Sequence, residues 1–299
     1  MRSTHRKLSS SAHRSFPVIL SVINLLTLLL TTSVLQQHLE LQQQAAVAAT
    51  PSGEAMPVGD IPGWHQIFTD AFTKTVPIGS FPGAVASKWL AYPDGWKDTS
   101  KNGTYFPSKV VSEHDGVMDL FIHTERGVHM VSAPVPKLAA GSHAYGSGLS
   151  AGRYVVRFRA DPIPCYKTAW LLWPDSEVWP RDGEIDFPEG DLDGTISGFT
   201  HRKNGTSGND KDEYDTAVTY SSWHTAVIEW RPGINDLKFY LDGKLVGHST
   251  SRVPNTPMHW VLQTETRLSG CVPTKSVAGH VLIDWVAVYT PIAPTTSHR

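Results

Sequence analysis

Short stretches in which apolar and polar residues alternate recur along the chain from about residue 64 onward. Within 153–159, Tyr154, Val156 and Phe158 alternate with three arginines. Residues 281–289 repeat the same two-residue period. This is the period of a β-strand that buries one face and leaves the other in contact with water or a ligand. We therefore expect many half-buried strands.

Turn residues separate these stretches, and no convincing long helix interrupts them. Asp242-Gly243 stands between 237–241 and 244–247, which is the pattern of a two-residue β-hairpin turn. Many short antiparallel strands without interleaved helices are typical of a β-sandwich or jelly roll. We expect an all-β fold, a sandwich of two antiparallel sheets in one domain at 64–291, followed by a tail at 292–299.

The first 48 residues predict an N-terminal signal segment. A basic start precedes the apolar run Phe16–Leu35, and Ala46-Val47-Ala48 offers a small-x-small cleavage site. A signal anchor that stays attached is the alternative, because about 20 apolar residues can span a bilayer. Both interpretations place the domain outside the cytoplasm, either secreted and extracellular or membrane-anchored. Residues 49–63 are expected to be a linker because they lack a core pattern.

Charge limits the class of partner. Charged residues make up 18% of the chain and the formal net charge is −2. Nucleic-acid binding needs clustered lysine and arginine, so we expect no nucleic-acid partner and favour a neutral substrate. Contact with a membrane is expected only if the N-terminal segment is retained. We expect the chain to act as a monomer.

The chain has two cysteines, Cys165 and Cys271. In an oxidising compartment they predict one disulfide that closes a long loop, with two buried free thiols as the alternative. Neither a C-x-x-C nor an H-E-x-x-H pattern is present, so we expect no zinc site.

Three carboxylates gather in the segment Glu184-Ile185-Asp186-Phe187-Pro188-Glu189. Glu184 and Asp186 are two residues apart, so on a strand they point to the same side. Glu189 stands at an odd offset from Glu184, which reverses its side unless one extra residue, a β-bulge, intervenes. Pro188 occupies the place where a bulge is needed, and proline is tolerated in sheets mainly at bulges and edges. The sequence thus predicts three carboxylates over one surface.

Carboxylates that converge in this way indicate glycoside hydrolysis. Like charges raise one another's pKa, so structural proteins avoid such clusters. A retaining glycosidase needs two carboxyl groups roughly 5–5.5 Å apart, one to attack the anomeric carbon and one to protonate the leaving oxygen. An acidic exposed strand, or a calcium site built from oxygen ligands, is the alternative.

The heptad Gly183–Glu189 resembles the bulged E-x-D-x-x-E signature of glycoside hydrolase family 16, in its laminarinase-like form. The similarity continues in the expected order over about residues 64–290. Its other segments are Gly152–Phe158, Trp170–Leu172, Trp179-Pro180, Trp223–Trp230, Lys238–Lys244 and Ile283–Tyr289. Phe187-Pro188 departs from the Ile-Met that is frequent at these positions, which leaves the subfamily and the substrate open.

The resemblance implies a concanavalin-like β-jelly-roll of two curved sheets, with a glycan cleft across the concave face. Carried over position by position, Glu184 corresponds to the nucleophile, Asp186 to the assisting carboxylate and Glu189 to the general acid/base. The implied activity is that of a retaining endo-β-glucanase, which hydrolyses β-1,3 or mixed β-1,3/1,4 linkages by double displacement without an organic cofactor. A structural calcium ion stays open, and no metal is expected among the site residues.

A glycan cleft needs aromatic side chains, because their rings stack on the apolar faces of sugars. The resemblance assigns Trp179 to the cleft. The other candidates for substrate binding are Trp170, Trp173, His201, Gln263 and Glu265. The two tryptophans among them have a core position as their alternative, because tryptophans in a β-sandwich are often buried.

Two other functions share these features. A transglycosylase forms the same covalent intermediate and passes it to a sugar instead of water. A non-catalytic carbohydrate-binding protein can have the same jelly-roll fold. The three intact acids favour an enzyme over a lectin.

Overall fold

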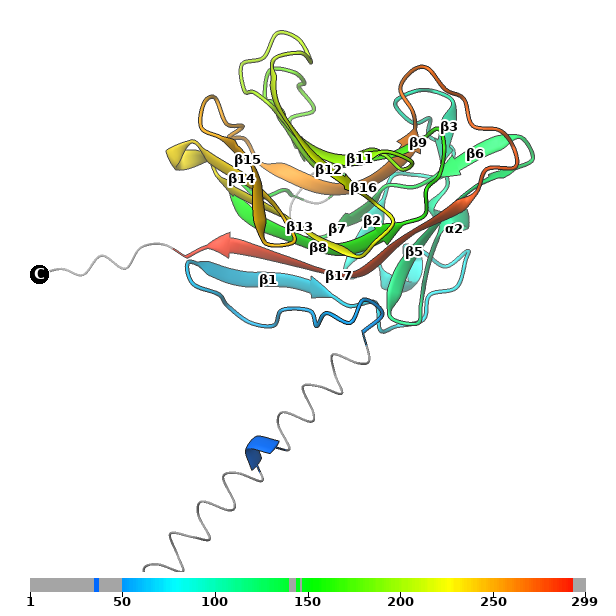
Figure 1. Ribbon diagram of the computed structural model, residues 1–299, viewed down its shortest axis with the longest axis horizontal. Coiled ribbons are helices and arrows are strands. Elements are labelled where there is room, and N and C mark those ends of the chain that lie inside the picture. The colour runs from blue at the N-terminus through cyan, green and yellow to red at the C-terminus, as the bar shows by residue number, and fades with distance from the viewer. Residues whose placement is uncertain (1–34, 38–49, 140–143, 146, 293–299) are drawn as a thin grey trace, which may run out of the picture. The chain divides into compact units, whose positions relative to one another are not determined.

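Strands account for most of the regular structure of the described residues, which are 35–37, 50–139, 144–145 and 147–292 of the computed structural model (Figure 1). The chain divides into two units, Met1–Ala49 and Thr50–Arg299. The expected signal segment lies outside the described residues except for a short helical piece at 35–37, and the tail from 293 lies outside them too. None of the helices in the described residues has the length and apolar character that a membrane span requires.

The larger sheet has ten strands within the described part of the chain. Its main path runs β15-β14-β13-β8-β17-β5-β6-β3, with β1 beside β17 and β4 beside β5, and every pair is antiparallel except β3 with β6. The strands are β1 (Trp64–Asp70), β3 (Gly103–Tyr105), β4 (Val111–His114), β5 (Val117–Glu125), β6 (Val128–Val131), β8 (Gly152–Ala160), β13 (His224–Arg231), β14 (Asp236–Leu241), β15 (Lys244–Ser249) and β17 (Gly279–Pro291).

The smaller sheet has five antiparallel strands in the order β12-β11-β10-β9-β16, again counted over the described residues. They are β9 (Tyr166–Pro174), β10 (Glu184–Asp191), β11 (Thr195–His201), β12 (Lys211–Thr219) and β16 (Met258–Thr266). Figure 1 shows this sheet above the larger one, curved so that loops rise at both of its ends. The remaining elements are β2 (Trp89–Ala91) paired with β7 (Pro134–Pro136), a short helix α2 (Pro107–Val110), and 3₁₀ turns at Gly83–Val85 and Pro232–Ile234.

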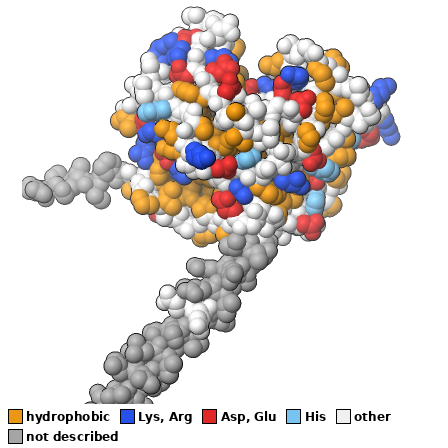
Figure 2. Space-filling view, viewed as in Figure 1, with side chains coloured by type: hydrophobic (Ala, Val, Ile, Leu, Met, Phe, Trp, Pro, Cys, Tyr) orange, Lys and Arg blue, Asp and Glu red, His pale blue; other side chains and the backbone are white. Residues whose placement is uncertain are grey.

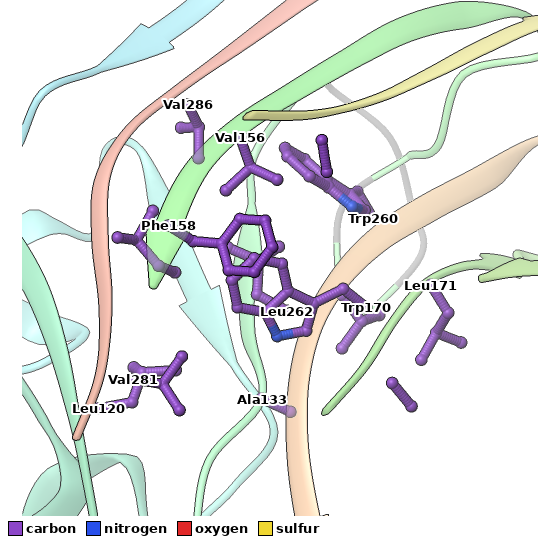
Figure 3. Packing of buried hydrophobic residues seen from close by; sticks show 14 of the residues in the cluster. Leu120, Ala133, Val156, Phe158, Trp170, Leu171, Trp260, Leu262, Val281 and Val286 are labelled. Carbon is purple, nitrogen blue, oxygen red and sulfur yellow. The ribbon is translucent and has the colours of Figure 1, made fainter. Parts of the chain in front are cut away.

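The main core fills the space between the two sheets (Figure 3). Phe158 of β8 meets Trp170 of β9 edge to face, with ring centroids 5.1 Å apart. Tyr154 meets Trp260 of β16 in the same way at 5.4 Å. Fully burying a ring such as Phe158 contributes roughly 1.5–3 kcal/mol. The predicted sandwich of curved antiparallel sheets is therefore confirmed, and a Trp170→Ala cavity is expected to cost about 3–5 kcal/mol.

The hairpin predicted at Asp242-Gly243 is also confirmed. Leu241 of β14 pairs with Lys244 of β15, so two residues form the loop. Both have positive φ, 49° and 74°, which is the requirement of a type I′ turn.

The outer face of the large sheet carries a second apolar cluster. It comprises Trp64, Val155, Val227, Trp285, Ala287 and Tyr289. The segment at 50–63, expected as a linker, makes specific contacts with this face. The Ser52 backbone N–H donates to Asp284 over 3.1 Å, and the Trp285 indole donates to the Glu54 carbonyl over 2.9 Å.

The disulfide between Cys165 and Cys271 is confirmed. It joins the residue before β9 to the loop that follows β16, with a sequence separation of 106. Because β9 and β16 are neighbours in the small sheet, the bond closes one end of the surface on which the predicted site lies.

Candidate active site

The strand β10 carries the predicted irregularity. Asp186 pairs with Phe199 of β11, and the next registered pair joins Glu189 to Ser197. Three steps along β10 therefore match two steps along β11, and the pairing with β9 shifts at the same place. One extra residue thus lies between Asp186 and Glu189, next to Pro188, and the predicted β-bulge is confirmed.

The bulge sets which side chains of β10 face the core. Ile185 and Phe187 belong to the core between the sheets, and Phe187 packs on Phe239 with ring centroids 5.1 Å apart. Glu184 and Asp186 alternate with them and turn away from the core. The charge of Glu189 acts on both Glu184 and Asp186, as expected for three carboxyl groups that share one face.

This face is the floor of a hollow. In the space-filling view the surface is depressed between two raised parts, over the small sheet (Figure 2). Trp173 of β9 and Trp179 of the loop before β10 lie here, with nearly parallel rings whose centroids are 6.5 Å apart. Trp179 is 39% exposed, and its indole N–H donates a hydrogen bond to Glu184. The loop therefore presents an aromatic surface beside the proposed nucleophile.

A second aromatic group lies near the carboxyl groups and was missed by sequence reasoning. Tyr92 packs against Tyr145, with centroids 4.8 Å apart, and Trp96 meets Tyr145 edge to face at 6.3 Å. Trp96 is 52% exposed. Burial, assisted by the charges of neighbouring groups that include Glu184, raises the pKa of the Tyr92 hydroxyl. These residues belong to segments that no motif marks, so only their aromatic character was a signal.

Glu184 and Asp186 share a hydrogen bond between their carboxyl groups. Burial, and then the charge of Glu189, raises the pKa of Glu184 to about 8. Burial, and then the charges of Glu184 and Glu189, raises the pKa of Asp186 well above its usual range. Asp186 is only 2% exposed and so is the better place for a shared proton. Its O–H can then donate to Glu184, which keeps Glu184 available as the carboxylate.

Lys167 of β9 is the cation that faces this group. Its Nζ lies 2.5 Å from Glu189 Oε1 and 3.8 Å from Glu265 Oε1. Burial lowers the pKa of Lys167, but the charges of Glu189 and Glu265 outweigh it, so the net pKa is raised. Glu265 is 2% exposed, and burial raises its pKa as well. Sequence reasoning named Glu265 and missed Lys167, although a lysine inside an apolar strand pattern was a signal.

His201 is placed among the predicted site residues. It is the cross-strand partner of Glu184, and its Nε2 lies 3.7 Å from Asp186 Oδ2. Burial lowers the pKa of His201, so the imidazole is neutral near pH 7. Its ring meets Trp179 edge to face at 5.9 Å. His201 is thus held between the carboxyl pair and the exposed tryptophan.

A cation could be held by this part of the site. One ligand atom each from Glu184, Asp186 and His201 lies within 4.8 Å of the others. A carboxyl pair that shares a proton competes with such binding, because a metal ion requires both groups deprotonated. The expectations of no metal, no cofactor and an open calcium site stay predictions.

The assignment of Trp170 to substrate binding is corrected. Trp170 is fully buried between the sheets against Phe158 (Figure 3). It is three residues from Trp173, and this odd offset places the two side chains on opposite faces of β9. Gln263 pairs with Ala169 of β9 and shares the hollowed face with Glu265, two residues further along β16. Gln263 is 8% exposed.

Comparison with known proteins finds similarity to glucanases. No protein-family model matches the chain. A β-glucanase of Bacillus subtilis (strain 168) is 28% identical over 161 residues, which are 52% of this chain. The match spans 56% of that protein's length.

Solved structures with the same fold cover most of the chain. SCLam, a non-specific endo-β-1,3(4)-glucanase from family GH16, aligns with a TM-score of 0.62 and 15% identity over 79% of this chain and 95% of its own. The laminarinase of Rhodothermus marinus aligns with a TM-score of 0.61 and 18% identity, over 77% and 98%. The endo-1,3-β-glucanase catalytic domain of Thermotoga petrophila RKU-1 aligns with a TM-score of 0.58 and 18% identity, over 79% and 100%. The chain therefore has the jelly-roll fold of the laminarinases and endo-glucanases of glycoside hydrolase family 16.

Proposed function

We propose that the protein is an exported, retaining endo-β-glucanase of glycoside hydrolase family 16, acting on β-1,3 or mixed β-1,3/1,4-glucans. The observation that carries the proposal is the bulge beside Pro188, which brings Glu189 to the face of Glu184 and Asp186. The similarity to a β-glucanase and the fold shared with laminarinases support the same activity.

The chemistry proceeds in two steps. Glu184 attacks the anomeric carbon while Glu189 gives its proton to the glycosidic oxygen, so the aglycone part of the glucan leaves and a glycosyl-enzyme forms. Glu189, now a carboxylate, takes a proton from water, and the resulting hydroxide replaces Glu184 on the anomeric carbon. Two inversions give net retention of configuration.

Asp186 assists Glu184 in both steps. Its hydrogen bond orients the Glu184 carboxylate and offsets part of the repulsion from Glu189. When Glu184 becomes an ester its charge disappears, and when it leaves the sugar the charge returns. A protonated Asp186 stabilises the carboxylate form without adding another negative charge.

The aromatic groups beside the carboxyl groups suit a neutral glucan. Trp179 and Trp173, together with the exposed Trp96, offer rings for stacking on glucose units. The acidic floor disfavours an anionic polysaccharide, because its charges meet carboxylates. Export is supported by the basic and apolar pattern of the first 48 residues and by the disulfide, which is typical of oxidising compartments.

The test is product analysis on a panel of laminarin, lichenan, agarose, carrageenan and xyloglucan. We expect oligosaccharides of intermediate length from laminarin or lichenan, as an endo-acting enzyme produces. Proton NMR of the first products should show the β-anomer before mutarotation, because the mechanism retains configuration. The α-anomer as first product would contradict the double displacement. Release from agarose or carrageenan alone would contradict the substrate class, and products longer than the starting chains would indicate a transglycosylase.

A further inference from the structure

Lys167 lies where the two neighbouring strands bring acids together. On one side, Lys167 pairs in register with Glu265 of β16. On the other side it pairs with Asp191 of β10, and Glu189 is two residues before Asp191 on that strand. Its Nζ bonds to Glu189 Oε1 over 2.5 Å and lies 3.8 Å from Glu265 Oε1. Only 8% of Lys167 is exposed, so water screens these interactions weakly.

The charges around Glu189 are unbalanced without this lysine. Titratable groups from three strands face Glu189 or Lys167: Glu184 and Asp186 from β10, Glu265 from β16 and His201 from β11. Lys211 of β12 and Asp98 of the loop at 97–104 lie behind them, and the Tyr220 hydroxyl faces Glu189 from the core side. The four carboxyl groups are those of Glu184, Asp186, Glu189 and Glu265. Among the ion pairs of the described residues, Lys167 is the one lysine or arginine that pairs with any of them.

We propose that Lys167 is a positioning residue for the general acid/base, which holds Glu189 by Oε1 and stabilises the negative charge that Glu189 carries after proton transfer. This role rests on the proposed function. Because Lys167 occupies one carboxylate oxygen, the other is left for the glycosidic oxygen. Glu265 in turn orients the ammonium group, and the Thr99 backbone N–H holds Glu265 Oε2 over 3.3 Å.

The balance of the first step shows where Lys167 acts. The O–H bond of Glu189 breaks as an O–H bond forms on the glycosidic oxygen, and the bond from that oxygen to the anomeric carbon breaks. Glu184 supplies the electron pair of the new bond to that carbon. Glu189 is left as a carboxylate beside the ammonium group, and Lys167 keeps its own proton throughout. The charge that develops on Glu189 in the transition state is therefore met by a fixed cation.

The experiment compares Lys167→Met with the wild-type full chain on two substrates. One is the glucan that the panel identifies, and the other is a dinitrophenyl β-glycoside of a matching oligosaccharide, whose leaving group needs no proton. We expect kcat on the glucan to fall roughly 10- to 100-fold with KM changed by less than about threefold. On the aryl glycoside we expect kcat/KM to fall far less, because it reports only the first step, in which this leaving group needs no proton. Removing a cation from a group of carboxyl groups should also move the pH profile on the glucan to higher pH.

Lys109→Met is the matched control, because Lys109 forms a 2.9 Å ion pair with Glu125 away from the hollow. Its pH profile should equal that of the wild type. Lys167→Arg keeps the charge, so its profile should stay in place while kcat/KM on the glucan falls more than kcat/KM on the aryl glycoside. This variant decides the matter if Lys167→Met does not fold. Equal losses on both substrates, or an unmoved profile in Lys167→Met, would overturn the role of Lys167 while leaving the glucanase intact. A wild-type chain that cleaves neither substrate would overturn the proposed function and this role together.

Discussion

The two sheets differ in how charged side chains are paired on the faces that point away from the core. On the large sheet, charged side chains have partners of opposite charge, and Arg153 pairs with Glu229 across neighbouring strands. On the small sheet, Glu184, Asp186 and Glu189 meet without such partners, apart from the bond of Glu189 to Lys167. Partly exposed pairs contribute only about 0–1 kcal/mol each, so the first face is close to neutral for stability. We expect the second face to destabilise the fold, and such a cost is typical of a functional site.

The largest expected effect tests this contrast on activity. Glu184→Gln removes the proposed nucleophile, so we expect kcat on the glucan to fall by at least about a thousandfold. Glu229→Gln removes an acid of similar exposure from the other face, and its kcat should stay within about twofold of the wild type. Initial rates on the preferred glucan check both variants. Comparable activity in both variants would show that the two faces do not differ in function.

Deleting Pro188 tests whether the bulge has a function beyond orientation. Without Pro188, two steps on β10 would match two on β11, and the acid that follows Phe187 would stand at an even offset from Glu184. It would still face the hollow, and Phe187 would keep its place in the core. We expect a folded protein whose kcat on the glucan falls roughly 10- to 100-fold, because the acid moves along the strand by part of a residue spacing.

The measurement is kcat beside a far-UV circular dichroism melt. Glu189→Gln, which removes the acid without changing the register, should be less active than the deletion. A deletion variant that is as inactive as Glu189→Gln, yet melts like the wild type, would show that catalysis depends on where the acid lies along the strand as much as on the face to which it points.

The bulge could be predicted from the sequence because strands have a strict two-residue period. Three acids at offsets of two and five cannot share a face without one extra residue, and Pro188 marks where it lies. The sandwich and the hairpin at Asp242-Gly243 follow from the same local rules. The disulfide could be predicted because the chain offers two cysteines and no choice of pairing.

The rest of the site depends on contacts between distant segments. In the sequence, Lys167 is a polar residue at the start of an apolar run. Only the pairing of β9 with β10 and β16 brings it to Glu189 and Glu265. Tyr92, which the charge of Glu184 influences, lies in a segment with no periodic pattern. Trp170 was placed wrongly because an apolar run of a buried strand, unlike an alternating one, does not show which residues face the core.

Trp179→Ala should have a smaller effect than either change to β10. Loss of the stacking surface is expected to raise KM for the glucan by up to about tenfold, since one ring contact contributes roughly 0.5–1.5 kcal/mol. The hydrogen bond from its indole to Glu184 also disappears, so kcat should fall modestly. Trp223→Ala is the control, because Trp223 packs under Arg159 on the opposite sheet. Steady-state kinetics on soluble oligosaccharides separate the two parameters, and an unchanged KM in Trp179→Ala would remove Trp179 from the binding surface.

The smallest expected effect is a change in thermal stability. We expect Glu184→Gln on the small sheet to stabilise the protein at high pH, and Glu229→Gln on the large sheet to destabilise it slightly. Burial raises the pKa of Glu184 from 4.5 to about 8, so the proton that Glu184 and Asp186 share is lost only near that pH. A carboxyl group whose pKa is higher in the folded state stabilises the fold below the unfolded pKa, and this contribution is lost as pH rises through the folded pKa. Wild type should therefore lose stability between about pH 5 and pH 9 that Glu184→Gln, with no charge to bury, retains.

One pKa unit corresponds to about 1.4 kcal/mol of stability, and about 1 kcal/mol moves Tm by roughly 2–4 °C in a domain of this size. Glu184→Gln should therefore melt at least about 3 °C above wild type near pH 9. The two should melt together near about pH 4, where both side chains are neutral. Glu229→Gln, in contrast, loses its ion pair with Arg153 and should melt slightly below wild type at neutral pH. Thermal melts across this pH range decide the question. A Glu184→Gln variant less stable than wild type at high pH would mean that the cluster stabilises the fold, and the carboxyl groups would then need no function to explain their presence.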